Sequence, residues 1–323
     1  MKKNKLLSSL LALALAISLA GCGAKTETAK TTETGTKVVQ NDSSTAKTSD
    51  NAVTTAVNNY FANMPQDVYK IPEKDFIEKV KATENIFILD IRQADVYAKG
   101  HIKGAVNLPW GTAISDNLEI LPKDKPIMVY CYTGQTAGQT VALLNMAGFN
   151  AKSVNLGWDL GISKVPGVEA VTETKENKLA ADAKKVEINA DIKNAIVKYF
   201  TGLNEVKGTN YANYKISEDN AKKLVDAKDS SVVFLSVRSA ADYATGHIEG
   251  ALNIPWGKGM QANFNTLPKD KKIIVYCYTG QTAGQTVAGL RLLGYDAVSL
   301  NGGMGTKANA PSGWANKGFP VVK

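Results

Sequence analysis

The sequence has few of the residues that most often bind metals. Its 323 residues include three cysteines and only two histidines, His101 and His247. Each of these histidines shares its part of the chain with a single cysteine that is distant in sequence. One histidine and one distant cysteine supply too few ligands for a closed metal site. We therefore expect no bound metal.

Concentrated positive charge is also missing. The formal net charge is +8, but Lys2, Lys3 and Lys5 contribute three of those units and the other lysines are scattered along the chain. No cluster of basic residues is interleaved with aromatic ones, although such clusters are typical of nucleic-acid interfaces. The sequence therefore predicts no nucleic-acid partner.

The chain has no apolar run long enough to cross a membrane in a mature protein. The longest run, Leu6–Ala20, follows a basic start and has the layout of a secretory signal peptide. We expect residues 1–21 to be that signal peptide. Its last residues and the next one, Leu19-Ala20-Gly21-Cys22, resemble the bacterial lipobox, in which the cysteine sulfur is acylated and the chain is cleaved just before it.

This resemblance implies that Cys22 becomes the lipidated N-terminus. The protein would then be bacterial, exported, and anchored by lipid at the extracytoplasmic face of the cell membrane. Residues 22–50 are rich in Thr, Ser, Lys and Ala and offer little to bury, so we expect a disordered tether. The alternative is a chance cysteine in an ordinary signal peptide.

The strongest pattern in the chain is an internal repeat. Cys131 and Cys277 are separated by 146 residues, as are His101 and His247, and Val129–Ala142 is repeated without change as Val275–Ala288. This periodicity predicts two copies of one domain, at residues 51–168 and 188–323, each opening with a helix. Residues 169–187 between them read as a linker or an exposed helix. A disulfide between Cys131 and Cys277 is an alternative, but their equivalent positions favour one role performed twice.

Short apolar runs alternate with helical patterns in each copy. Ile86–Asp90 and Ile127–Tyr130 have the composition of strands buried on both faces, and Thr136–Met146 that of a helix closed by Gly148. The second copy repeats this order. Alternation of this kind predicts an α/β fold in which each domain is a mainly parallel sheet flanked by helices on both faces.

Each remaining cysteine lies between a predicted strand and a predicted helix, where ligand crevices form in parallel sheets. The residues after it are small or polar and surround a glycine, so successive backbone N–H groups could point inward and stabilise a thiolate or bind an anion. The alternative is a small apolar core residue. The candidate loop residues are Tyr132, Thr133, Gly134, Gln135, Thr136 and Ala137 after Cys131, and Tyr278, Thr279, Gly280, Gln281, Thr282 and Ala283 after Cys277.

The loop Cys-Tyr-Thr-Gly-Gln-Thr resembles the active loop of the rhodanese family. Upstream, Asp90-Ile91-Arg92 and Gly100–Pro109 resemble the family's D-x-R and G-H-I-x-G-A-x-N-x-P motifs, and Gly246–Pro255 repeats the second of these. The resemblance implies two tandem rhodanese-like domains in a sulfurtransferase of the thiosulfate sulfurtransferase type. Cys131 and Cys277 would carry sulfur as a persulfide from a small sulfur-containing anion or persulfide donor to a thiol or cyanide acceptor, without a cofactor.

The resemblance assigns supporting roles to four further residues. In this family the histidines corresponding to His101 and His247 belong to a turn that braces the strand ends, and the alternative is a direct catalytic role paired with the cysteine. Arg92 and Arg238 would form an ion pair or a backbone clamp, and would bind substrate only if they faced the pocket. In the second copy Ser236 replaces Asp90, so the ion pair expected there would be altered.

Two other functions are compatible with parts of this sequence. Cysteine phosphatases close a similar loop with an arginine, but Thr136 and Thr282 occupy that position here, which disfavours phosphate-ester chemistry. A lipoprotein that uses the rhodanese fold to bind sulfur species or a protein partner without turnover stays open, because fold alone does not define function. Many family members that bind a dianionic donor carry a Lys or Arg in or beside the loop, and both loops here are uncharged.

Overall fold

The computed structural model describes residues 43–323. The predicted signal peptide (1–21) and Cys22 lie outside the described residues. The first helix, α1, begins at Ser43, inside the segment 22–50 for which we expected a disordered tether. Once a helix is nucleated by packing further along, each added residue gains a hydrogen bond at little entropic cost, which accounts for this extension.

Two five-stranded parallel sheets form the centre of the molecule, one in each copy of the repeat. Their strand orders are β1-β6-β5-β2-β4 and, in the same direction, β8-β12-β11-β9-β10, so the two sheets have the same topology. The strands of the first sheet are β1 Lys70–Ile71, β2 Phe87–Asp90, β4 Val106–Asn107, β5 Ile127–Tyr130 and β6 Ala151–Val154. Those of the second are β8 Lys215–Ile216, β9 Val232–Ser236, β10 Leu252–Asn253, β11 Lys272–Tyr276 and β12 Ala297–Leu300.

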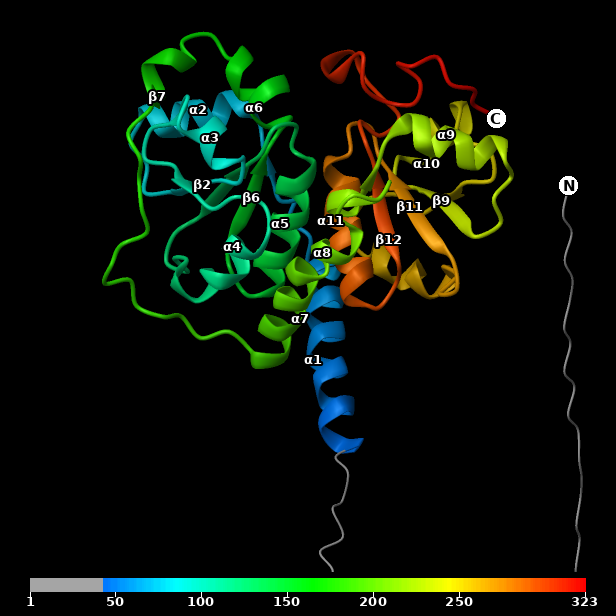
Figure 1. The fold of residues 1–323 in the computed structure, drawn as a ribbon, viewed down its shortest axis with the longest axis horizontal. Helices are drawn as coiled ribbons and strands as arrows, with labels where there is room; N and C mark the ends of the chain where they lie inside the picture. Colours follow the sequence, from blue (N-terminus) through cyan, green and yellow to red (C-terminus); the bar gives the residue numbers. More distant parts are fainter. Residues whose placement is uncertain (1–42) are drawn as a thin grey trace, which may run out of the picture. The chain divides into compact units, whose positions relative to one another are not determined.

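Helices cover these sheets, which confirms the predicted tandem α/β architecture (Figure 1). The α-helices are α1 Ser43–Ala62, α2 Glu73–Lys81, α3 Ala94–Tyr97, α4 Thr112–Asp116, α5 Gln135–Met146, α6 Gly157–Leu160, α7 Ala190–Thr201, α8 Leu203–Val206, α9 Glu218–Asp226, α10 Ala240–Thr245 and α11 Gln281–Leu292. We call residues 63–189 the N-terminal half and residues 202–323 the C-terminal half. The helices α1 and α7 open the two copies.

The predicted linker 169–187 is in part a structural element of the N-terminal half. β7 (Thr172–Glu173) pairs antiparallel with β3 (His101–Ile102), and Asn177 forms a further bridge with Val106. Residues 172–177 are therefore part of the domain, and the rest of the segment, residues 178–187, connects the two copies without a helix or strand. The short β3 strand leaves backbone donors and acceptors that need partners, and β7 supplies them.

Each opening helix packs on the opposite copy. Phe61 of α1 lies edge-on to Trp256 and Phe264 of the C-terminal half, with ring centroids 5.8 and 5.1 Å apart. Phe200 of α7 lies edge-on to Trp110 of the N-terminal half at 5.2 Å. Hydrogen bonds follow the same crossed arrangement. The Tyr60 hydroxyl of α1 donates to Gln285 of the C-terminal half, and the Tyr199 hydroxyl of α7 donates to Gln139 of the N-terminal half. The two halves therefore share one hydrophobic core.

The helices α5 and α11 face each other where the halves meet (Figure 1). A Cβ atom added to Gly138 would lie 2.3 Å from the carbonyl oxygen of Gln281, and one added to Gly284 would lie 2.4 Å from that of Gln135. Only glycine allows two backbones to approach this closely. The starts of both helices, next to the two cysteines, are thus fixed against each other.

Candidate active site

Each cysteine lies directly after a central strand and before the first residue of the helix that meets its counterpart. The Cys131 sulfur accepts hydrogen bonds from the backbone N–H groups of Gly134 and Ala137, with sulfur–nitrogen distances of 3.2 and 3.4 Å. The Cys277 sulfur accepts one from Gly280 at 3.1 Å. Both side chains are 2% exposed and neither is in a disulfide. The loop therefore turns main-chain donors toward the sulfur, as the sequence predicted.

The glycine in each loop makes this turn possible. Gly134 and Gly280 have φ angles of 86° and 93°, in the left-handed region that other residues rarely adopt. Each is also the residue before the first turn of a helix, α5 or α11, whose free N–H groups point back toward the cysteine. Sulfur and helix end are thus brought together by one backbone conformation.

A second loop holds the first from behind. The Cys131 carbonyl accepts a hydrogen bond from the backbone N–H of Trp158 at 2.8 Å. The Cys277 carbonyl accepts one from the backbone N–H of Met304 at 2.8 Å. A Cβ atom on Gly157 or on Gly303 would lie 2.5 Å from those same carbonyl oxygens. Sequence reasoning did not single out Gly157. Gly157 follows β6 by three residues, and a glycine close to a strand end is a signal of close backbone approach.

The other loop residues predicted as site residues have distinct surroundings. Tyr132 and Tyr278 accept hydrogen bonds from the backbones of Gln93 and Ser239, and Tyr278 also donates to Asp242. The remaining loop side chains are buried or half-buried against the loops, and two of them, the Gln135 and Gln281 amides, reach into the opposite half. The predicted members in this group are Thr133, Gln135, Thr136, Ala137, Thr279, Gln281, Thr282 and Ala283.

Arg92 is buried in an ion pair. Its guanidinium donates to both carboxylate oxygens of Asp90, with a shortest distance of 2.6 Å, and to the Gly100 carbonyl at 2.8 Å. It also stacks 4.2 Å from the ring centroid of Trp158, the residue that binds the Cys131 carbonyl. Burial, the largest single effect, would lower the pKa of Arg92, but the hydrogen bonds and negative charge of Asp90, together with Tyr130, raise the pKa overall. Arg92 therefore supports the loop from beneath.

Arg238 lacks the equivalent partner. Ser236 stands where Asp90 does, and its hydroxyl accepts a hydrogen bond from the Arg238 backbone N–H at 3.4 Å. The Arg238 guanidinium donates to the Gly246 carbonyl, but none of the described residues accepts a hydrogen bond from its buried Nε. The two halves therefore differ in the charge balance beneath the loop.

The two histidines bind main chain. The His101 ring nitrogens lie 2.8 Å from the Tyr97 carbonyl and 3.0 Å from that of Lys175, and the ring stacks on Tyr97. His247 contacts the Tyr243 carbonyl at 3.1 Å in the same way. Both nitrogens of His101 are engaged by backbone, so the ring braces the turn and does not reach the sulfur. Within residues 43–323 no three His, Cys, Asp or Glu side chains gather as a metal site would require.

A pocket of about 740 Å³ lies beside Cys277, which is within the usual size range of ligand sites. Trp256 and the loop residue Thr279 form part of its wall. Lys70 and Leu156, which belong to the N-terminal half, also line it. Sequence reasoning did not anticipate that residues of one half would complete the site of the other.

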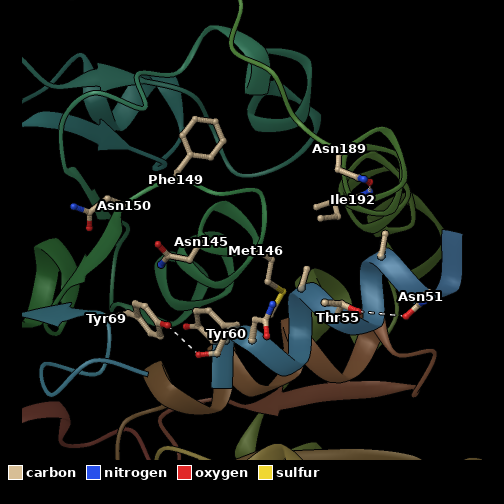
Figure 2. Close-up of a pocket in the computed structure, with 13 residues that line it drawn as sticks. Asn51, Thr55, Tyr60, Tyr69, Asn145, Met146, Phe149, Asn150, Asn189 and Ile192 are labelled. Atoms are coloured by element: carbon tan, nitrogen blue, oxygen red, sulfur yellow. Dashed lines mark hydrogen bonds between the residues drawn. The ribbon is translucent and has the colours of Figure 1, made fainter. Parts of the chain in front are cut away.

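A larger pocket lies elsewhere, between α1, the end of α5 and the start of α7 (Figure 2). Asn145, Met146 and Ile192 line it, and Tyr60 and Tyr69 stack at one side with ring centroids 4.4 Å apart. Neither cysteine loop contributes to this pocket.

Among the described helices, none is both long enough and apolar enough to span a lipid bilayer.

Comparison with known proteins identifies the family. The rhodanese-like domain family matches residues 73–162 and 217–306, so the chain belongs to that family and carries its domain twice. A sulfurtransferase of Allochromatium vinosum is 32% identical over 107 residues, which are 33% of this chain and 91% of the relative. Thiosulfate sulfurtransferase GlpE of Pseudomonas entomophila is 35% identical over 88 residues, 27% of this chain and 80% of GlpE. Each aligned length is about one copy of the repeat.

Among solved structures, SseA from Escherichia coli, described as a 3-mercaptopyruvate sulfotransferase, is 17% identical and aligns with a TM-score of 0.33. The alignment covers 73% of this chain and 98% of SseA. The family and its named members together point to sulfur transfer as the general activity.

Proposed function

We propose that the protein transfers sulfane sulfur through persulfides formed on Cys131 and Cys277. The observation that carries this proposal is that backbone N–H groups of the loop donate to each sulfur, two to Cys131 and one to Cys277. Such donors stabilise a thiolate and the anionic persulfide that replaces it. The ionised sulfur is the nucleophile that this chemistry needs.

The proposed reaction has two displacements. The Cys thiolate attacks the outer sulfur of a donor such as thiosulfate or a polysulfide, so a new S–S bond forms and sulfite or a shortened polysulfide leaves with the electron pair of the broken bond. An acceptor thiolate or cyanide then attacks the outer persulfide sulfur. The S–S bond between the cysteine sulfur and the outer sulfur breaks, its electron pair restores the cysteine thiolate, and the product is a new persulfide or thiocyanate. No external oxidant or reductant is consumed.

Steady-state kinetics of the full chain with thiosulfate or polysulfide as donor and cyanide as acceptor would test the proposal. We expect thiocyanate to form above the uncatalysed rate, with the parallel double-reciprocal lines of a two-displacement mechanism. If no donor supports thiocyanate formation above that rate, the fold serves binding of sulfur species or a partner protein instead.

We also propose that Cys22 carries a lipid that anchors the exported protein at the extracytoplasmic face of a bacterial membrane. Support comes from the signal-peptide layout and the lipobox-like residues before Cys22. In bacteria fed a labelled fatty acid, the full chain should take up label and sediment with membranes, and Cys22→Ala should do neither. Cys131→Ala is the matched control and should stay in the membranes. Equal labelling of Cys22→Ala would contradict the anchor.

A further inference from the structure

The two cysteine loops carry no charged side chain, although sulfur donors such as thiosulfate and polysulfide are anions. Backbone donors can hold part of such a charge, but a site for a multiply charged anion usually includes a cation. The cation, if there is one, must come from outside the loop.

Each loop touches the sheet of the opposite half. The Gln135 amide donates to the Ser299 hydroxyl at 2.5 Å and to the Leu300 carbonyl at 2.9 Å. The Gln281 amide donates in the same way to the Ser153 hydroxyl and to the Val154 carbonyl. The loop after Cys131 therefore lies on β12, and the loop after Cys277 lies on β6.

A lysine stands beside each of these serines on the neighbouring edge strand. Lys215 of β8 is the register partner of Ser299, and Lys70 of β1 is the register partner of Ser153. Laterally paired residues of a sheet direct their side chains to the same face. Each lysine thus extends from the face that the opposite loop contacts. Among the described residues, neither ammonium group has an ion-pair partner.

One further observation at each site places the lysines near sulfur. Lys70 lines the pocket that contains Cys277. Burial lowers the pKa of Lys215, and the negative charge of a thiolate at the nearby Cys131 opposes that lowering. The first observation is that a lysine lines a pocket, and the second is an electrostatic effect on a lysine. Lys70 and Lys215 occupy equivalent positions in the two copies of the repeat.

We propose that Lys215 and Lys70 are the cationic substrate-binding residues of the Cys131 and Cys277 sites, respectively, each supplied by the opposite half of the chain. The ligand class is an anionic sulfur compound whose charged end meets the lysine while its outer sulfur meets the cysteine. This inference rests on the proposed function for its meaning, but the placement of the lysines can be tested without it. Neither site is complete without both halves.

The two sites differ in the acid that accompanies the lysine. Glu73 lines the Cys277 pocket together with Lys70 and offsets part of its charge. The equivalent Glu218 is buried and accepts a hydrogen bond from the Gly313 backbone at 2.7 Å. We therefore expect the Cys131 site to favour anions more strongly than the Cys277 site.

Alkylation of the full chain by iodoacetate and iodoacetamide tests the proposal directly. These reagents have nearly the same size and mechanism, but only iodoacetate is an anion. Peptide mass spectrometry reads the rate at each cysteine separately. Lys215→Gln should lower the iodoacetate to iodoacetamide rate ratio about tenfold at Cys131 and leave it unchanged at Cys277. Lys70→Gln should lower the ratio about tenfold at Cys277 and leave it unchanged at Cys131. Glu73→Gln should raise the ratio at Cys277.

Charge-conserving and remote variants are the controls. Lys215→Arg and Lys70→Arg should keep most of the ratio, and Lys184→Gln, which removes an exposed lysine from the connecting segment, should change it at neither cysteine. Unchanged ratios in both glutamine variants, or a change at the cysteine of the same half, would overturn the proposal. Because alkylation needs no sulfur donor, this result is independent of whether the protein turns over. If it does turn over, the same variants should raise the KM for thiosulfate with little effect on kcat.

Discussion

Replacing both Cys131 and Cys277 by serine is expected to reduce sulfur transfer from thiosulfate or polysulfide to the uncatalysed rate. A serine hydroxyl in the same loop keeps every backbone donor but cannot form the S–S bond that stores the transferred sulfur. Each single variant should keep the activity of its intact half, because each cysteine has its own strand, loop and helix. Thiocyanate formation by the full chain and its three variants is the measurement.

Loss of fold would mimic loss of chemistry, so the thermal midpoint must be compared as well. Both cysteines are in the hydrophobic core, and the change to serine places a hydroxyl beside the same N–H donors. We expect a destabilisation of about 1–3 kcal/mol for each, not unfolding. Activity that persists in a folded double variant would show that neither cysteine carries sulfur.

The second large effect concerns the buried ion pair beneath the first loop. Asp90→Ser should destabilise the protein by about 3–5 kcal/mol, because it leaves the Arg92 guanidinium buried without its counter-charge. The C-terminal half offers the reciprocal change. Ser236→Asp would give the unpartnered Nε of Arg238 a carboxylate, and we expect a gain of about 1 kcal/mol.

Thermal or denaturant unfolding of the two variants checks this pair of predictions. We expect the free energy of unfolding to fall in Asp90→Ser and to rise in Ser236→Asp. If both variants lose stability by similar amounts, the C-terminal half has adapted to an uncompensated arginine, and the comparison between the halves fails.

The sheets and the cysteine loops could be predicted from sequence because their signals are local. The strands β5 and β11 are apolar runs that end at a cysteine, and a glycine-centred polar turn follows each of them. A strand, a tight turn and a helix in that order leave one place for the sulfur, at the carboxyl end of a parallel strand. The structure places both cysteines there.

The crossing of the two halves could not be predicted. Tyr60-Phe61 and Tyr199-Phe200 present the same apolar pair in both copies, so either helix could pack on either half. Lys70 and Lys215 are far from the cysteines in sequence, and only the crossing brings them near. No spacing rule within one copy relates a lysine on one half to a sulfur on the other.

The exact repetition of Val129–Ala142 as Val275–Ala288 has two physical causes. A chemical constraint on the loop is one cause of such exact repetition. Gly138 and Gly284 show a second constraint, since each helix start packs against the backbone of the equivalent helix in the opposite half and a side chain on either would collide with it. A self-complementary contact conserves the repeat whether or not the loop is reactive, so repetition alone is weaker support for catalysis than the direction of the N–H groups.

Intact-mass spectrometry of the full chain after exposure to thiosulfate or polysulfide tests the central claim most directly. The account predicts a gain of one sulfur atom at each of Cys131 and Cys277, removed by cyanide and lost from one site at a time in Cys131→Ser and Cys277→Ser. A protein that gains no cyanide-labile sulfur from any donor, while both thiols remain free, would contradict it.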